Sequence, residues 1–166
     1  MSRPSIDIET QNSMFDVIKS GWVSQGKKTE EFEANLSEYF SSKVVVVNNG
    51  TSALTAALLA HGIKSGDKVV VPSFTFVATS SAAKLIGAKI IIADVDIETL
   101  NITPNSIEKI VKEHGDIKAV LIVDMAGQTL DLEPIIELSK RYNFILIEDS
   151  AQAIGSEYKN KKIGSF

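Results

Sequence analysis

Five short apolar runs limit the fold of this chain more than any other feature. Each is nearly continuous in hydrophobic, mostly β-branched residues, without the polar–apolar alternation of a half-exposed strand. The runs are Val44–Asn48, Lys68–Ser73, Lys89–Val95, Ile117–Val123 and Phe144–Asp149. A strand that is apolar on both faces is buried on both faces, as in a parallel sheet. The sequence therefore predicts five strands in a mainly parallel sheet.

Helical patterns lie between these runs. Apolar residues recur at helical spacing in Thr29–Phe40, Ser52–His61, Thr79–Ile86 and in two segments that follow Thr103 and Asp131. Thr103 is a typical N-cap, and a proline follows it at the first helical position. Alternating strands and helices predict an α/β fold with three layers, α/β/α. We expect residues 1–25 to form an N-terminal arm and residues 26–166 to form one domain.

The composition excludes several function classes. The formal net charge is −4 and the pI is about 5.2, which argues against binding nucleic acid. The chain has no cysteine, so it has neither disulfides nor thiolate metal sites. It also contains no apolar stretch of membrane-spanning length, and its start lacks the apolar core of a secretory signal. These features predict a soluble cytoplasmic protein with no membrane partner.

Polar and aromatic residues follow the predicted strands at their carboxyl ends. In a parallel sheet these ends meet at one edge, where ligands bind. The stretch Asn48–Ser52, NNGTS, places a glycine and free first-turn N–H groups at the start of a helix, which favours a phosphate. The alternative is an ordinary strand-to-helix turn that Asn49 or Thr51 caps. The stretch lacks both the lysine of a P-loop and the spacing of GxGxxG.

Two further features belong to the same edge. Phe74 and Phe76 are two residues apart, so they share a side if the chain stays extended, and either one stacks on a flat ring or packs in the core. Glu148 and Asp149 end the last run, and successive strand residues point to opposite faces. Only one of them therefore faces a ligand. A carboxylate there either holds a ring nitrogen protonated or joins Asp94 and Asp124 around magnesium.

In order along the chain, these segments resemble one family of enzymes. They are GWVSQGKKTEEFEANL, NNGTSAL, VVVPSFTFVAT, GAKIIIADVDIETLNITP, VDMAGQTLDLEPI and IEDSAQAIGSEYKNKKIGSF. Together they are similar to the N-terminal part of the DegT-type nucleotide-sugar aminotransferases, which use pyridoxal 5′-phosphate (PLP) and have the aspartate-aminotransferase fold. The resemblance implies an incomplete large domain of that fold, without the small C-terminal domain.

The resemblance also implies roles for individual residues. Gly50, Thr51 and Ser52 would bind the cofactor phosphate, and Phe76 would stack on the pyridine ring. Asp149 would hold the ring nitrogen protonated while Glu148 points away. Gln152 would bind the ring hydroxyl. Many relatives carry histidine at the position of Asp124, and no metal is implied.

The family's Schiff-base lysine would lie beyond Phe166. Lys159, Lys161 and Lys162 are in the wrong segment to replace it, so we expect the chain alone to be inactive. The resemblance implies a nucleotide-linked keto sugar as substrate, glutamate as the common amino donor, and a homodimer. The alternatives are a non-catalytic binding or assembly module and one half of a split enzyme that pairs with a C-terminal complement.

Overall fold

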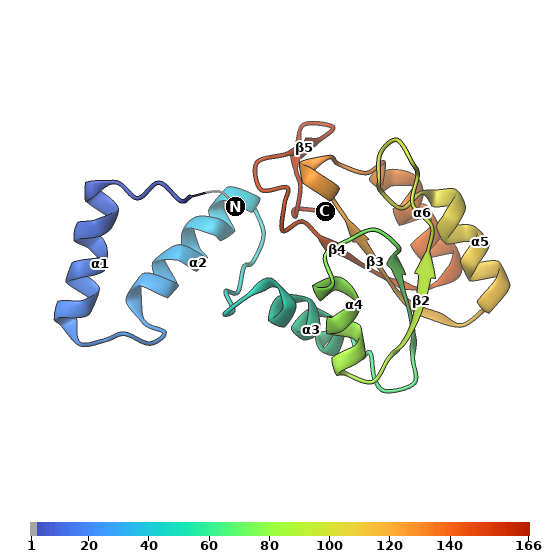
Figure 1. Cartoon of the computed structure of the whole chain (residues 1–166), viewed down its shortest axis with the longest axis horizontal. Helices are drawn as coiled ribbons and strands as arrows, with labels where there is room; N and C mark the ends of the chain where they lie inside the picture. Colours follow the sequence, from blue (N-terminus) through green and yellow to red (C-terminus); the bar gives the residue numbers. More distant parts are fainter. Residues whose placement is uncertain (1–2) are drawn as a thin grey trace. The chain divides into compact units, whose positions relative to one another are not determined.

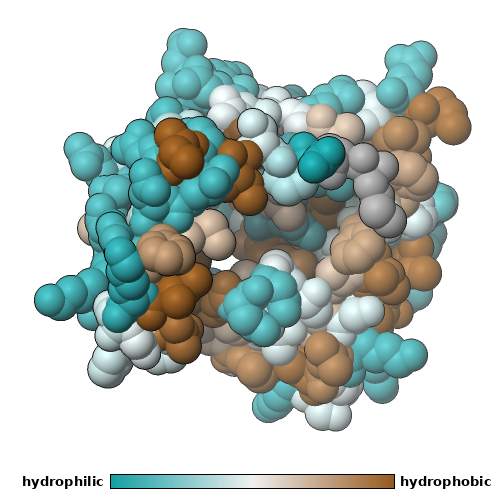
Figure 2. All heavy atoms as spheres, turned by 60° about the vertical axis from the view of Figure 1, so that its left-hand side comes forward, coloured by the Kyte–Doolittle hydropathy of each residue, from teal (hydrophilic) through white to brown (hydrophobic). Residues whose placement is uncertain are grey.

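The computed structural model describes residues 3–166 and divides the chain into two compact units after Val46. The first unit holds two helices, α1 (Ile8–Ser20) and α2 (Lys27–Phe40). Neither helix contains a buried residue. Figure 2 shows hydrophobic side chains at the surface. The expected boundary between an arm of residues 1–25 and a domain of residues 26–166 stays a prediction.

The second unit is an α/β fold (Figure 1). Its elements are α3 (Gly50–Ala60), β1 (Lys68–Pro72), α4 (Ala78–Leu85), β2 (Lys89–Ala93), α5 (Pro104–His114), β3 (Ile117–Val123), the 3-10 turn η1 (Met125–Gly127), α6 (Leu132–Tyr142), β4 (Ile145–Asp149), β5 (Glu157–Tyr158) and β6 (Lys161–Lys162). The first four strands form one parallel sheet in the order β2-β1-β3-β4. The last two form a small antiparallel hairpin.

Helices cover both faces of the parallel sheet, which confirms the three-layer prediction. Val69 and Val71 of β1 pack with residues of α3 and α4 in one apolar cluster. Val70, between them in sequence, packs on the other face with residues of α5 and α6. All three valines are at most 2% exposed. The apolar run of β1 is therefore continuous because both faces of this central strand are covered, whereas Ile92 of the edge strand β2 is 64% exposed.

The prediction of a strand at Val44–Asn48 is wrong, because this segment pairs with no other strand among the described residues. Two of its N–H groups are bound to side chains of α2 instead. Val44 N–H donates to Ser37 Oγ (3.0 Å), and Val46 N–H donates to Glu33 Oε1 (2.8 Å). The segment makes no ladder, so the parallel sheet that the described residues form has four strands rather than five.

The two helices predicted to follow Thr103 and Asp131 begin where the sequence places them. Thr103 caps α5 by accepting the N–H of Ser106 (3.2 Å), and Pro104 begins the helix. Asp131 occupies the N-cap position of α6, but its carboxylate accepts the hydroxyl of Tyr158 rather than a helix N–H. Among residues 3–166, no helix is long and apolar enough to cross a bilayer.

Candidate functional site

A cavity of about 290 Å³ lies at the carboxyl edge of the parallel sheet. Four parts of the second unit contribute to it: the start of α3, the loop from β1 into α4, the end of β3 with η1, and the end of β4. The lining residues are Asn49, Gly50, Thr51, Leu54, Thr75, Phe76, Ala78, Val123, Met125, Asp149, Ala151 and Gln152. Five of the six predicted cofactor residues thus meet around one cavity, and Ser52 lies one position beyond Thr51.

The start of α3 gives the cavity an end that suits an anion. Asn49 Oδ1 caps the helix by accepting the N–H of Ser52 (2.9 Å), so the amide of Ser52 is already used. Gly50 and Thr51 come before it in the first turn, where N–H groups have no intrahelical partner. A Cβ built on Gly50 meets nothing within 4 Å, which leaves open space beside these amides. The turn is thus both capped by Asn49 and open to a phosphate.

Asp149 is held at the cavity by a chain of hydroxyl groups that the sequence did not reveal. Its Oδ2 accepts the hydroxyl of Thr79 (2.9 Å), and its Oδ1 accepts the N–H of Ala151 (3.3 Å). Thr79 is fully buried, and its hydroxyl also contacts that of Thr75 (3.0 Å). A hydroxyl has one proton. Because Thr79 donates to Asp149, Thr75 must donate to Thr79, and this chain fixes the carboxylate.

Gln152 is oriented by the turn after β3. Its Oε1 accepts the N–H of Ala126 (2.8 Å). Ala126 has a positive φ of 54°, and Gly127 follows with a φ of 82°. These conformations direct the amide of Ala126 toward Gln152. Since the oxygen is occupied, the Nε2 amide of Gln152 remains as the donor that can serve a ligand.

Phe76 lies on the wall of the cavity and is 70% exposed. Phe74 is not among the lining residues, and it is partly exposed elsewhere. The two phenylalanines do not belong to an extended segment, because the chain bends at residues 73–75. The aromatic surface that this site offers therefore comes from Phe76.

The structure separates the two acids at the end of β4. Asp149 lines the cavity, whereas Glu148 Oε2 accepts the N–H of Gly164 (3.2 Å). Burial, with a further contribution from Asp124, raises the pKa of Glu148 to about 7. Burial likewise raises the pKa of Asp124, a residue that is completely inaccessible to solvent. Alternation along the strand had predicted this separation.

The magnesium alternative has no support from the geometry. Asp94 is exposed, and Asp124 Oδ2 accepts the hydroxyl of Ser150 (3.1 Å). Across residues 3–166, no three acidic or histidine side chains gather in a way that could hold a metal ion.

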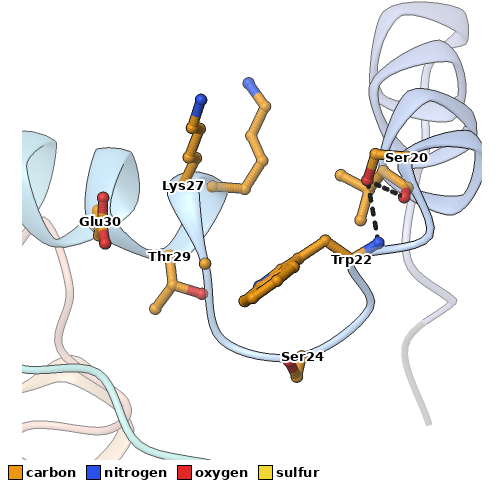
Figure 3. A pocket seen from close by; sticks show the side chains of 9 residues that line it. Ser20, Trp22, Ser24, Lys27, Thr29 and Glu30 are labelled. Carbon is orange, nitrogen blue, oxygen red and sulfur yellow. Dashed lines mark hydrogen bonds between the residues drawn. The ribbon is translucent and has the colours of Figure 1, made fainter.

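The first unit contains a larger cavity, of about 450 Å³ (Figure 3). Trp22 lies along its wall, and the indole Nε1 donates to the carbonyl of Gln25 (2.8 Å). Lys28, another lining residue, pairs with Glu31 (2.8 Å). This cavity contains none of the strand ends that carry the predicted chemistry, so we do not assign the site to it.

Solved structures with this fold, among them a sugar aminotransferase in its PLP form at 30% identity over 99% of this chain with a TM-score of 0.90, place the chain in the class of fold type I PLP-dependent enzymes. Within that class, the chain belongs to the DegT/DnrJ/EryC1/StrS aminotransferase family, whose model matches residues 4–166.

Individual relatives agree with this family. GDP-perosamine synthase of Caulobacter vibrioides is 35% identical over 99% of this chain. An aminotransferase from Psychrobacter cryohalolentis has the same fold, with a TM-score of 0.92 and 35% identity over 99% of this chain. GDP-4-keto-6-deoxy-D-mannose-3-dehydratase of E. coli, solved with hydrated PLP bound, is 26% identical over 99% of this chain with a TM-score of 0.90.

The chain spans less than half the length of these relatives. It covers 44% of the Caulobacter protein, 42% of the Psychrobacter chain and 44% of the E. coli chain. Among the described residues that line the cavity of the second unit, none is a lysine. Lys159 instead pairs with Glu133, and Lys161 lies against the ring of Phe166.

Proposed function

We propose that the chain is the N-terminal, cofactor-binding portion of a PLP-dependent aminotransferase that acts on a nucleotide-linked keto sugar. The observation that carries the proposal is the meeting of Gly50, Thr51, Phe76, Asp149 and Gln152 around one cavity. The relatives support the reaction class, since one is an aminotransferase and another is a GDP-perosamine synthase.

Each residue has a definite task in this proposal. The first-turn N–H groups at Gly50 and Thr51 bind the phosphate of the cofactor, with the hydroxyl of Ser52 as a further donor. Phe76 covers one face of the ring. Asp149, fixed by Thr79, keeps a proton on the ring nitrogen, and Gln152 donates Nε2–H to the ring hydroxyl.

The residues fit the cofactor on chemical grounds. The cavity has N–H donors and open space at one end, a carboxylate at another, and apolar walls from Leu54 and Val123 between them. A flat, phosphorylated ring with a basic nitrogen matches that set of donors. When bound, PLP serves as an electron sink for the substrate carbon attached to nitrogen.

The test is binding of pyridoxamine 5′-phosphate, which needs no lysine, measured by calorimetry on the 166-residue chain. We expect weak but saturable binding. Asp149→Asn should weaken it at least about tenfold, because a carboxylate partner of the ring nitrogen is lost; a tenfold change is about 1.4 kcal/mol. Asp94→Asn is the matched control, since Asp94 also follows a strand but is exposed outside the cavity.

Two results would overturn the proposal: no binding by the unchanged chain, or equal binding by Asp149→Asn and the unchanged chain. Borohydride reduction in the presence of PLP tests whether a lysine of this chain reaches the cavity. We expect no lysine-dependent cofactor band at the cavity. A reduced band that required Asp149 and mapped to a lysine in contact with the cavity would contradict that expectation.

Within this proposal the sugar amination serves glycan biosynthesis in the cytoplasm, with glutamate as amino donor and a homodimer as the working form. The exposed apolar residues of α1, among them Ile8, Phe15 and Ile18, favour association. Light scattering at rising concentration tests it, and a strict monomer would count against it.

The alternative is a non-catalytic binding or assembly module, or one half of a split enzyme. No observation favours it over the aminotransferase. Addition of a separately expressed C-terminal complement separates the split enzyme from the non-catalytic module, because only the split enzyme regains transamination.

A further inference from the structure

Two acids that the proposed site does not use lie side by side behind it. Asp124 follows β3 directly, and Glu148 is the next-to-last residue of β4. These strands pair in parallel, with Ile122 opposite Glu148 and Val123 opposite Asp149. Asp124 comes two residues after Ile122, the partner of Glu148, so the two acidic side chains lie on the same face of neighbouring strands.

Each carboxyl group has one satisfied and one unsatisfied oxygen. Asp124 Oδ2 accepts the hydroxyl of Ser150 (3.1 Å), and Glu148 Oε2 accepts the N–H of Gly164 (3.2 Å). The remaining oxygens, Asp124 Oδ1 and Glu148 Oε1, are buried and have no hydrogen-bond donor. Two ionised carboxylates cannot satisfy each other, because both only accept. One proton between the two groups provides a donor and removes one of the two buried charges.

We propose that Asp124 and Glu148 share a single proton, and that this acid pair holds the ends of β3 and β4 together and thereby positions Asp149. The link to Asp149 is direct, because Asp124 N–H donates to the carbonyl of Asp149 (3.2 Å). Gly164, beyond β6, is tied to the same pair. The sharing of the proton is independent of the proposed function. Its effect on cofactor binding through Asp149 rests on that function.

The surroundings of the pair favour the protonated form. Burial is the main cause that raises the pKa of Asp124, and the negative charge of Asp149 adds to it, while Ser150, Leu130 and Glu148 act in the opposite direction. For Glu148, burial and the charge of Asp124 outweigh the N–H of Gly164, and its pKa is about 7. The proton is taken up from solvent below that pH and released above it.

Carboxyl-carbon NMR of the unchanged 166-residue chain tests the proposal. The resonance of the Glu148 carboxyl should titrate near pH 7 rather than at its ordinary value of 4.5. The Asp124 carboxyl and the amides of Asp124 and Gly164 should shift in the same step. A purely structural role would leave these amides independent of pH. Titration of Glu148 at its ordinary value would overturn the proposal.

Two variants sharpen the test. Glu148→Gln retains a donor toward Asp124, so the step near pH 7 should disappear from the Asp124 resonance. Asp124→Asn removes the shared charge, so the midpoint of Glu148 should fall by at least about one unit. An unchanged midpoint in Asp124→Asn would overturn the proposal even if Glu148→Gln failed to fold. Pyridoxamine 5′-phosphate binding above and below the step separates the two claims, because loss of binding at every pH refutes only the cofactor assignment.

Discussion

At Gly50, a single substitution should weaken phosphate binding without destabilising the fold. It is the first residue of α3, and a Cβ at this position meets no atom of the protein within 4 Å. Gly50→Ala should therefore fold normally and gain up to about 1 kcal/mol from better helix propensity. The added methyl group would occupy the space where a phosphate approaches the amides. We expect pyridoxamine 5′-phosphate to bind at least about tenfold more weakly.

Unphosphorylated pyridoxamine is the control ligand for this variant. Its binding should change little, because it places no group at the start of α3. If Gly50→Ala weakened both ligands equally, the phosphate would not lie at Gly50 and Thr51. Urea unfolding of the same variant checks that the fold is intact.

Gly26 has the opposite character, because a Cβ there would lie 2.4 Å from Nε1 and 2.5 Å from Cδ1 of Trp22. Gly26→Ala should push the indole away and break its hydrogen bond to Gln25. We expect a loss of about 1 kcal/mol in the first unit, because the exposed indole moves aside and loses one hydrogen bond. Trp22 is the only tryptophan, so its near-ultraviolet circular dichroism and its emission report the change directly. Gly50→Ala is the matched control, and an unchanged Trp22 signal in Gly26→Ala would contradict the prediction.

At the residue scale, the sequence was informative where the cause is local. Alternation along a strand placed Glu148 and Asp149 on different sides, and the structure agrees. The support of Asp149 by Thr79, 70 residues earlier, is not readable in this way. No local pattern distinguishes a threonine that reaches a distant carboxylate from one that packs in a helix, so the hydroxyl chain needed the three-dimensional fold.

At the scale of single elements, the helix ends make separate contributions to the free energy of unfolding. Thr103 and Ser106 form a reciprocal cap at the start of α5, with distances of 3.2 Å and 3.1 Å between each side-chain oxygen and the other residue's backbone nitrogen. Thr103→Ala should lower the free energy of unfolding by about 1 kcal/mol. Urea unfolding followed by far-ultraviolet circular dichroism measures it.

The N-cap of α6 provides the control, because the Asp131 side chain bonds to Tyr158 and not to the helix. Asp131→Ala should therefore lose its effect in a Tyr158→Phe background, while Thr103→Ala keeps its effect there. If Thr103→Ala also lost its effect, the contribution assigned to the cap would belong to a wider network.

Two elements were predicted incorrectly from the sequence, each for its own physical reason. Val44–Asn48 has the composition of a buried strand, but a strand forms only where a neighbour supplies partners for its N–H and C=O groups. A local pattern does not contain that information. Helix α1 was overlooked because it buries nothing, although Asp7 at its N-cap and Gly21 at its C-cap were visible signals. Strands with helices on both sides were predicted correctly, since burial on both faces dictates their composition.

For the molecule as a whole, opposing groups shape the dependence of stability on pH. Hydrogen bonds and ion pairs lower the pKa values of surface acids such as Asp96 and Glu108. These acids stabilise the folded state once the pH rises above their lowered pKa values. Their contribution is complete above the ordinary pKa values of 3.8 for Asp96 and 4.5 for Glu108. Glu148 acts in the opposite sense. Its pKa is about 7 in the folded chain against an ordinary value of 4.5, so the folded state binds more protons between these values. Stability must then fall as the pH rises through that window.

We therefore expect maximal stability near pH 4.5 to 5, a decline up to about pH 7, and a plateau above it. One pKa unit corresponds to about 1.4 kcal/mol, but Glu148 is partly exposed, so the decline should be on the order of 2 kcal/mol. Urea midpoints across the range measure it. Glu148→Gln should flatten the decline, because the amide stays neutral, whereas Glu113→Gln at the exposed end of α5 should leave it unchanged. A Glu148→Gln variant whose stability fell with pH as steeply as that of the unchanged chain would show that another group controls the decline.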